Sequence, residues 1–488
     1  METSTFSLNP EQKEAVSHTG GPSLVAAGPG SGKTRILTHK IAHLIKEMEV
    51  SPQKILAVTF TNKAAQEMRE RVAALIGQDV GGMWIGTFHA TCAKTLRIDG
   101  EEVGIPKSFV IYDENDRKSL IKKIIKASGL EGRFSPHSIQ SAISNAKNEL
   151  IGHEEYEQLA GGYFQEIVAE IFVKYQQKLK EADALDFDDL LFKAVRLLKD
   201  QPQILEKWQK RFLHILVDEY QDTNRAQYEL VQLLSQKHQN LTVVGDMSQA
   251  IYSWRGADFR NILRFEKDYP KAKIFRLSQN YRSTKTILSA AKSLIEHNKT
   301  HIPLDLWTQN GNGLPIVVSE VQSELDEAYY ITSQIRSMRS GGGIAKFSDF
   351  AVLYRTNAQS RVLEEVFMRE GIPYVLIGGF KFYERKEVKD LLAYLKLLLN
   401  SKDTVSFQRA EKIGKRRLKN FLEIAGPETL NEPPVVILDK ILKATKYIEY
   451  LNDGTEQGQS RIENAKELRS VAAPFSTLGE FLEHVALV

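Results

Sequence analysis

The chain has 488 residues, too many for one ordinary hydrophobic core, so about two to four domains are expected. Its 42% hydrophobic and 26% charged residues are typical of a globular protein and exclude a disordered or collagen-like chain. Lys and Arg number 65 against 62 Asp and Glu, a net charge of +3. Any nucleic-acid site must therefore be a local patch rather than a basic field over the whole surface.

Cys92 is the single cysteine, which excludes a disulfide framework within the chain and is typical of a reducing compartment. The first residues, METSTFSLNPEQK, contain neither the basic nor the apolar segment of a secretory signal. The apolar stretch LLAYLKLLL (391–399) is shorter than the roughly 18 residues of a membrane span. We therefore expect a cytoplasmic protein with no membrane partner.

Short apolar runs recur along the chain, and several lead into helical patterns. The first run precedes a segment, 34–48, whose apolar residues fall on one helical face. Near-continuous apolar strands that alternate with helices favour a parallel sheet covered on both faces. The expected strands of this sheet are SLVAA (23–27), KILAVTF (54–60), FLHILV (212–217), LTVVG (241–245) and KIFRL (273–277).

The pattern then changes three times along the chain. Lys- and Glu-rich helices fill roughly 90–190, and a second α/β pattern begins near 281 with the runs PIVVSEV (315–321), FAVLYRT (350–356) and PYVLIGG (373–379). From about 380 the sequence is helical and charged. The prediction is an α/β fold in four parts: a first sheet domain (1–90 and 190–280), a helical insertion (91–189), part of a second sheet domain (281–378) and a second helical insertion (379–488).

Residues 27–34, AGPGSGKT, follow the first strand and precede a helix, as a Walker A phosphate loop does. The first position holds Ala27 where the pattern asks for Gly, but turn glycines still let backbone N–H groups face a phosphate at the helix N-terminus. Lys33 would reach the β- and γ-phosphates, and Thr34 would ligate Mg²⁺. The alternative, a Gly-rich turn without a ligand, does not explain the Lys-Thr pair. The loop residues expected to bind nucleotide are Gly28, Gly30, Ser31, Gly32, Lys33 and Thr34.

An acidic pair ends the strand in ILVDEYQD (215–222). Asp218 would hold Mg²⁺ through water, and Glu219 would orient and deprotonate the attacking water. Alone, such a pair is as well explained by the charge preference of a helix N-terminus. Together with the phosphate loop it favours a nucleoside-triphosphatase.

With these residues in place, the chain resembles the superfamily 1A DNA helicases, the UvrD, PcrA and Rep group. The similarity runs in order over essentially the whole chain, and so many long motifs are highly specific. The matching segments are LNPEQKEAV (8–16), TFTNKAAQEM (59–68), GTFHA (86–90), DFDDLL (186–191), DEYQDTN (218–224), VVGDMSQAIYSWRGA (243–257), LSQNYRST (277–284), AVLYRTNAQSRVLEE (351–365) and GGFKFYERKEVKDLLAYL (378–395).

The resemblance implies two RecA-like sheet domains, the second incomplete, with nucleotide held in the cleft between them. It implies that Gln12 reads adenine, that Arg35 touches the nucleotide and that Gln249 senses the γ-phosphate. Tyr281 would stack on adenine, and Arg282 would reach the γ-phosphate from the second domain. The alternatives are a packing aromatic for Tyr281 and a surface ion pair for Arg282.

The resemblance also implies DNA contacts by aromatic and small polar groups, as sequence-independent binding of single strands requires. Any one aromatic is more often a core residue, and His89 is equally well explained as structural. Four cations near Gly414, in EKIGKRRLKNF (411–421), match a duplex-contacting segment or form a solvated helix face. The implied DNA contacts are Phe60, Thr61, Asn62, Thr87, Phe88, His89, Phe187, Trp254, Arg255, Arg355, Asn357, Lys415 and Arg416.

The function implied is an ATP- and Mg²⁺-dependent helicase or translocase that moves 3′ to 5′ on single-stranded DNA in repair or replication restart. Its partners would be single strands, single-strand/duplex junctions and repair proteins. The family pattern also contains a TxHxxKGLEF-like motif and a later γ-phosphate arginine, and neither occurs in the 488 residues. Three explanations stay open: a fragment of a longer gene, a C-terminal fragment that binds in trans, or a natural ATP-gated DNA-binding protein with little unwinding. Without the segment that carries these motifs, the second sheet domain would have an unpaired sheet edge and unpaired apolar faces.

Overall fold

The structure is a computed structural model that describes residues 8–78, 80–253, 256–298, 304–340, 346–356, 359–377, 382–452 and 456–487. The chain divides into two compact units, one of Met1–Gly313 with Asp390–Val488 and one of Leu314–Lys389.

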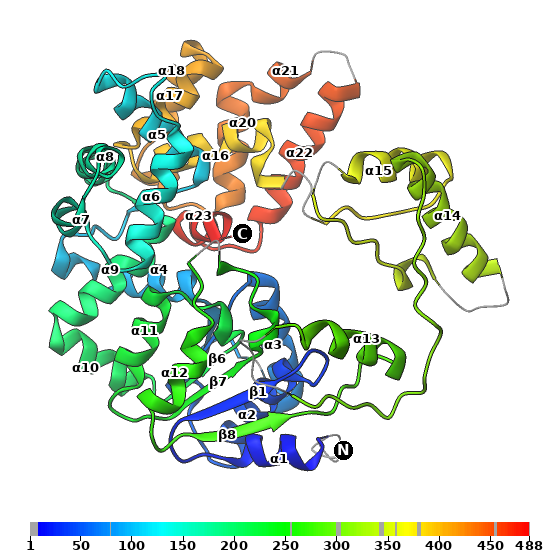
Figure 1. Ribbon diagram of the computed structural model, residues 1–488. Helices are drawn as coiled ribbons and strands as arrows, with labels where there is room; N and C mark the ends of the chain where they lie inside the picture. Colours follow the sequence, from blue (N-terminus) through cyan, green and yellow to red (C-terminus); the bar gives the residue numbers. More distant parts are fainter. Residues whose placement is uncertain are drawn as a thin grey trace. The chain divides into compact units, whose positions relative to one another are not determined.

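The first unit contains a six-stranded sheet with helices on both sides of it (Figure 1). Every pairing is parallel, in the order β3-β2-β6-β7-β1-β8. In the register of β1, which lies between β7 and the edge strand β8, Val25 is opposite Val244 on one side and Phe275 on the other. The strands are β1 (Ser23–Ala27), β2 (Ile55–Thr59), β3 (Trp84–Thr87), β6 (His214–Val217), β7 (Leu241–Gly245) and β8 (Lys273–Leu277).

Successive side chains of these strands enter two different cores, because side chains of a strand alternate between the faces of a sheet. Val25 packs with α1 (Pro10–Ser17), α2 (Lys33–Lys46) and α3 (Asn62–Ile76). Its neighbour Leu24 belongs to the opposite core. The helices of that core are α4 (Phe88–Asp99), α9 (Phe187–Asp200), α10 (Pro202–Arg211), α11 (Arg225–Ser235) and α12 (Arg260–Asp268).

The prediction of an α/β fold with a parallel sheet covered on both faces is confirmed. All five strands expected for this sheet are present, each with its bounds within two residues of the apolar run. The sixth strand, β3, was not predicted from periodicity, since its four residues include a glycine and run directly into α4.

Helices dominate the segment between α4 and α9. They are α5 (Glu114–Ala127), α6 (Pro136–Asn148), α7 (His153–Leu159) and α8 (Tyr163–Glu181), around a core that includes Ile121, Ile143 and Phe172. Two short strands, β4 (Val110–Tyr112) and β5 (Ala184–Asp186), pair in parallel beneath them.

The C-terminal helices of the first unit pack on this helical segment. Tyr112 donates its hydroxyl to Asp403 Oδ1 at 2.9 Å, and Lys396 Nζ lies 2.7 Å from Asp116 Oδ2. After α13 (Lys285–Ile295), the helices beyond the second unit are α16 (Lys386–Leu399), α17 (Thr404–Ile413), α18 (Lys415–Ile424), α19 (Pro427–Leu430), α20 (Pro434–Thr445), α21 (Tyr447–Leu451), α22 (Glu456–Ala472) and α23 (Leu478–Leu487). None of the described helices is both long and apolar enough to cross a membrane.

In the described part of the second unit, α14 (Glu324–Ser340) and α15 (Ser360–Arg369) pack around Ile335, Phe367 and Ile372. The three strands predicted here, 315–321, 350–356 and 373–379, are not formed in their described residues. In the described residues no neighbouring strand pairs with these segments. An extended segment without a paired neighbour gains no inter-strand hydrogen bonds. Their apolar side chains are consequently exposed, with Val318 92%, Leu353 89% and Val375 88% accessible.

Candidate active site

The turn between β1 and α2 has the backbone of an anion-binding loop. Gly30 and Gly32 adopt positive φ angles of 68° and 94°, and Gly32 stands directly before the first residue of α2. No side chain accepts a hydrogen bond at this N-cap, so the first N–H groups of α2 stay directed out of the helix. These N–H groups and the positive end of the helix dipole form a site for phosphate.

The loop is held from both sides. Gln12 on α1 donates Nε2 to the carbonyl of Ser31 at 2.9 Å. After β8, Asn280 Nδ2 donates to Pro29 O at 2.6 Å and the Tyr281 N–H to Gly30 O at 2.9 Å. The predicted nucleotide residues Tyr281 and Arg282 are thus brought to the loop because they follow β8, which pairs with β1, and the ends of neighbouring parallel strands meet at one edge of a sheet. Gln12 reaches the loop from α1.

Gln12 lies deeper than its predicted role suggests. Its side chain is fully buried, and its Oε1 accepts from the Asn9 N–H at 3.1 Å while Nε2 bonds the loop. Tyr281 is 42% exposed, so its ring has a free face. Adenine recognition by Gln12 and Tyr281 stays a prediction.

Carboxylates gather opposite Lys33 at the end of β6. Burial, followed by the charge of Glu219, raises the pKa of Asp218 to about 7, and the same causes raise the pKa of Asp222 to about 6. The Lys33 ammonium partly offsets both shifts, so its charge lies near both groups. Glu219 adopts a left-handed backbone with φ 49°, a strained conformation typical of functional sites. A divalent cation bound here would supply positive charge to these carboxylates, but the described residues contain no group of three His, Cys, Asp or Glu side chains that could hold a metal ion by themselves.

A hydrogen-bonded chain connects these carboxylates to the predicted γ-phosphate sensor. Gln221 donates Nε2 to Glu219 Oε2 at 2.8 Å and accepts the Asp246 N–H on its Oε1 at 2.9 Å. Asp246 Oδ2 in turn accepts from Gln249 Nε2 at 2.7 Å. The candidate catalytic residues Glu219 and Gln249 therefore belong to one hydrogen-bonded chain.

Two stacked aromatic pairs follow neighbouring strands. Phe60 and Tyr252 stack with centroids 4.8 Å apart and an interplanar angle of 29°. His89 and Phe187 stack at 3.8 Å, also at 29°. Phe60, His89 and Phe187 were predicted DNA contacts, and Tyr252 was not. The four rings are only partly buried, as a base-stacking surface requires.

The other predicted DNA contacts, apart from Lys415 and Arg416, fall in four groups. Thr61 and Thr87 accept backbone hydrogen bonds as the N-caps of α3 and α4, and Asn62 is the first residue of α3. Phe88 is only 2% exposed and packs in the core, so its ring is not available to DNA in this structure. Arg355 is exposed on the second unit, whereas Trp254, Arg255 and Asn357 lie outside the described residues.

The comparisons with known proteins agree with this geometry. Residues 8–270 match the UvrD/REP helicase N-terminal domain, and residues 275–473 match the UvrD-like helicase C-terminal domain. The chain belongs to the UvrD/REP helicase family.

Relatives with the printed name ATP-dependent DNA helicase PcrA include proteins of Staphylococcus epidermidis, Bacillus subtilis and Staphylococcus aureus. The first is 51% identical over 84% of this chain and 56% of its own length. The Bacillus protein is 43% identical over 99% of this chain and 72% of its own, and the S. aureus protein 44% over 95% and 69%. The chain thus spans little more than half the length of the S. epidermidis relative it matches.

A buried ion cluster supports the aromatic pair of this UvrD/REP chain at Phe187. Asp186 caps α9 directly before Phe187, and its Oδ2 lies 2.6 Å from Lys147 Nζ and 2.8 Å from the Tyr175 hydroxyl. Burial alone would raise the pKa of Asp186, but Lys147 and Arg117 hold it well below its usual range. A fixed carboxylate at the N-cap fixes the start of α9, and with it the position of the Phe187 ring.

The basic turn between α17 and α18 is open to solvent. Gly414 at this turn has φ 150°. Lys415 is 87% exposed in its side chain, and Arg416 is also exposed. Arg417 instead lies over the Tyr450 ring at 4.4 Å. Lys415 and Arg416 can therefore meet a phosphate backbone, while Arg417 holds the turn.

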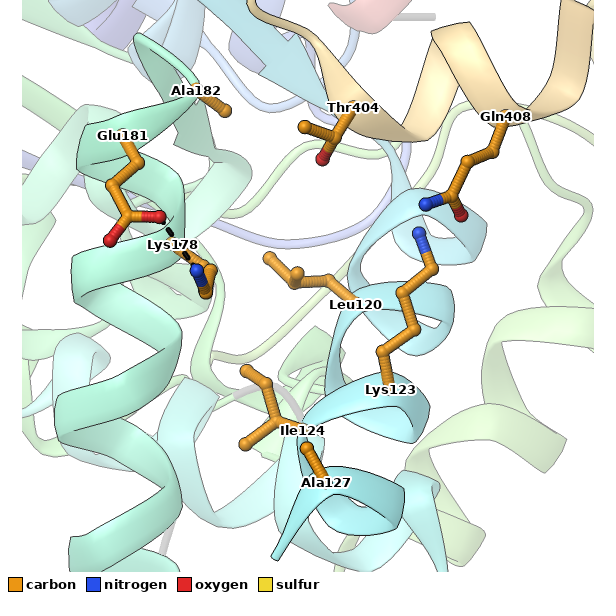
Figure 2. Close-up of a pocket in the computed structure, with 9 residues that line it drawn as sticks. All are labelled: Leu120, Lys123, Ile124, Ala127, Lys178, Glu181, Ala182, Thr404 and Gln408. Carbon is orange, nitrogen blue, oxygen red and sulfur yellow. Dashed lines mark hydrogen bonds and ion pairs between the residues drawn. The ribbon is translucent and has the colours of Figure 1, made fainter.

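A separate cavity of about 300 Å³ lies between α5, α8 and α17 (Figure 2). Leu120 and Ile124 point into it, and the Lys123 amine lies beside the Gln408 amide at its edge. Lys178 turns to Glu181 at 2.7 Å. The cavity has no glycine turn and shares no residue with the phosphate loop, so it is not part of the nucleotide site.

Several residues of the site were missed from the sequence although they lie inside quoted motifs, and they include Tyr252, Gln221 and Asn280. Tyr252 carried a signal, because it is an aromatic residue in the motif that contains the predicted DNA contact Trp254. Gln221 and Asn280 carried none, because their importance lies in contacts with residues 25 and 251 positions away.

Proposed function

We propose that this chain is the ATP-hydrolysing part of a DNA helicase or translocase that moves 3′ to 5′ on single-stranded DNA in repair or replication restart. The observation that carries the proposal is the meeting of Lys33, the carboxylates after β6 and the Tyr281–Arg282 backbone around one glycine loop. The direction of movement and the pathway come from the family resemblance alone.

Each residue has a defined task in this proposal. Mg²⁺-bound ATP supplies the phosphoanhydride bond whose hydrolysis drives movement. The loop N–H groups of Gly28, Gly30, Ser31 and Gly32 and the Lys33 ammonium bind the phosphates, and Thr34 and Asp218 hold the cation. Glu219 accepts a proton from the attacking water, while Arg282 and Arg35 neutralise charge on the nucleotide.

Coupling to DNA is proposed to run through the chain from Glu219 to Gln249. Tyr252 follows Gln249 by three residues and stacks on Phe60, so a shift of Gln249 at the γ-phosphate would move an aromatic pair at the strand ends. Phe60, His89, Phe187 and Tyr252 would stack on bases. This arrangement gives nucleotide hydrolysis a direct structural path to bound DNA.

The partners proposed are single-stranded DNA, junctions with duplex reached by Lys415 and Arg416, and repair proteins or a C-terminal segment in trans. A cytoplasmic location goes with this function and is supported by the presence of one cysteine, Cys92, which cannot form a disulfide within the chain. The four-part domain division remains part of the proposal.

Steady-state ATP hydrolysis with and without single-stranded DNA tests the proposal. We expect stimulation by DNA, loss of nucleotide binding in Lys33→Ala, and retained binding without turnover in Glu219→Gln. Strand displacement on duplexes with a 3′ or a 5′ tail then reports direction. DNA-stimulated hydrolysis that persists in both variants would refute the site. Nucleotide-dependent DNA affinity with background phosphate release would indicate an ATP-gated binding protein instead.

A further inference from the structure

Gln279 connects two elements of the site that are distant in sequence. Its Oε1 accepts a hydrogen bond from Tyr281 Oη at 2.9 Å and a second from Asn9 Nδ2 at 3.2 Å. The residue is 8% exposed, so water does not compete freely for this oxygen. A carboxamide oxygen has two lone pairs, and both are used here.

The backbone of Gln279 is itself fixed. It forms a parallel bridge with Trp307, in which the Trp307 N–H donates to Ser278 O at 3.0 Å and the Asn280 N–H to Trp307 O at 2.8 Å. The side chain therefore projects from a rigid extension of β8 rather than from a free loop.

The hydrogen bond that the Tyr281 hydroxyl donates to Gln279 determines the orientation of the Tyr281 ring. The Tyr281 N–H is bonded to Gly30 O at 2.9 Å, and the following turn is held by Asn280 Oδ1, which accepts the Arg282 N–H at 2.9 Å. These bonds fix the backbone of Tyr281, and the bond from its hydroxyl to Gln279 fixes the ring. Tyr281 is 42% exposed, so without this hydrogen bond its ring could rotate until a base stacked on it. Binding of the base would then carry the entropy cost of ordering the ring.

The other donor belongs to the N-cap of α1. Asn9 Oδ1 accepts the Gln12 N–H at 2.7 Å, while its Nδ2 reaches Gln279. Gln12 then bonds Ser31 O of the phosphate loop. The start of α1 and the ring of Tyr281 are thus tied to one oxygen atom.

We propose that Gln279 is a positioning residue that sets the affinity of the site for the base of the nucleotide, by holding Tyr281 and the start of α1 in one arrangement. The inference rests on the proposed function, in which Tyr281 and Gln12 hold adenine. It assigns Gln279 no contact with phosphate. Loss of the residue should therefore affect recognition of the base and leave triphosphate binding unchanged.

The test measures equilibrium binding of ATP, GTP and inorganic tripolyphosphate to the full chain. Gln279→Met keeps the volume and removes the acceptor. We expect ATP affinity to fall about three- to tenfold, the range given by a lost hydrogen bond of ordinary strength. Tripolyphosphate affinity should stay within about twofold, and the preference for ATP over GTP should shrink.

Three further variants distinguish a positioning role of Gln279 from a general loss of folded structure. Gln279→Glu keeps an acceptor for both donors and should restore ATP affinity. Asn9→Asp keeps the N-cap of α1 but removes the donor to Gln279, and should weaken ATP binding. In the double variant Gln279→Met with Tyr281→Phe, the loss should be smaller than the sum of the single losses, because both changes break the same bond.

The outcomes distinguish this inference from the proposed function. If the unaltered chain binds no ATP, the proposed function fails. If it binds ATP and Gln279→Met binds ATP equally well, the inference alone fails. An equal loss of ATP and tripolyphosphate affinity in Gln279→Met, with no recovery in Gln279→Glu, would also overturn it by showing a general structural role.

Discussion

Gln221 donates a carboxamide N–H to the carboxylate of Glu219, with 2.8 Å between Nε2 and Oε2. Both residues lie in the turn after β6, and Gln221 is 1% exposed. The bond holds one carboxylate oxygen, so the other is left in a defined direction for a water molecule.

We expect Gln221→Leu to lower kcat for DNA-stimulated ATP hydrolysis by about tenfold or more, with KM for ATP changed less than about twofold. The reason is that Glu219 loses its orientation while the phosphate loop is untouched. Steady-state kinetics check this. Gln209→Leu is the matched control, since Gln209 is also a buried carboxamide but donates to Leu233 O, away from the site. A similar fall in kcat for the control would attribute the effect to lost stability.

Gly30 and Gly77 offer a matched test of the phosphate loop. Both have positive φ, 68° and 75°, so alanine costs backbone strain of about 1 kcal/mol at either position. A Cβ at Gly30 would lie 2.7 Å from Asn280 Nδ2, whereas one at Gly77 would meet nothing within 4 Å. We expect Gly30→Ala to weaken ATP binding strongly, because Asn280 and the loop must separate.

Gly77→Ala should lose a similar amount of unfolding free energy from backbone strain while binding ATP normally. Chemical denaturation and nucleotide titration of both variants check the pair. Unchanged ATP affinity in Gly30→Ala would mean that the contact between Asn280 and the loop is not needed for binding.

Lys396 and Asp116 connect α16 to α5 as a largely buried ion pair, with side chains 13% and 18% exposed. Removing one partner of such a pair leaves an uncompensated charge, so Lys396→Met should cost about 3 kcal/mol of unfolding free energy. The exposed pair of Lys292 and Asp305 is the control, and Lys292→Met should lower the unfolding free energy much less than Lys396→Met does.

The loss of unfolding free energy in Lys396→Met, called the deficit below, should also depend on pH. Burial raises the pKa of Asp116, and Lys396 is the main group that opposes this rise. A raised carboxyl pKa means that the folded state binds more protons than the unfolded state, so the deficit should shrink as pH falls. Denaturation of the variant and the unaltered chain across acidic pH measures this difference, and a constant deficit would contradict it.

The sequence predicted the sheet well because its strands are buried on both faces. Val25 and Leu24 enter different cores, so the run that contains them has to be apolar throughout. The strands predicted around Val318 and Leu353 were wrong, because an apolar run alone does not make a strand. An apolar run shows that a segment can enter a sheet, but only a neighbouring strand can supply its ladder.

The candidate site was predictable only where a residue type carries its own chemistry. Lys33 and Asp218 could be proposed from their residue types and from their positions after predicted strands. Phe60 and Phe88 are the same residue type after adjacent strands, yet Phe60 stacks on Tyr252 and Phe88 is buried in the core. Gln221 and Gln279 each connect a neighbour in the sequence to a distant residue, Asp246 and Asn9 respectively, which only folding brings near. Such roles leave no pattern in a sequence.

Lys40 gives a last prediction, on stability at alkaline pH. Its side chain is 3% exposed, and its Nζ donates to Ala15 O and His18 O at the end of α1. Burial lowers the pKa of Lys40 from 10.5 to about 8. Between these two values the unfolded chain binds the proton and the folded chain does not, so the contribution of this residue to the unfolding free energy rises with pH. Relative to Lys40→Met, the unaltered chain should therefore gain stability from pH 8 to 10.5 and show no such change between pH 6 and about 7.5. Urea denaturation of both proteins across this range measures the difference, and a relative stability that falls as pH rises would show that the carbonyl contacts keep Lys40 charged.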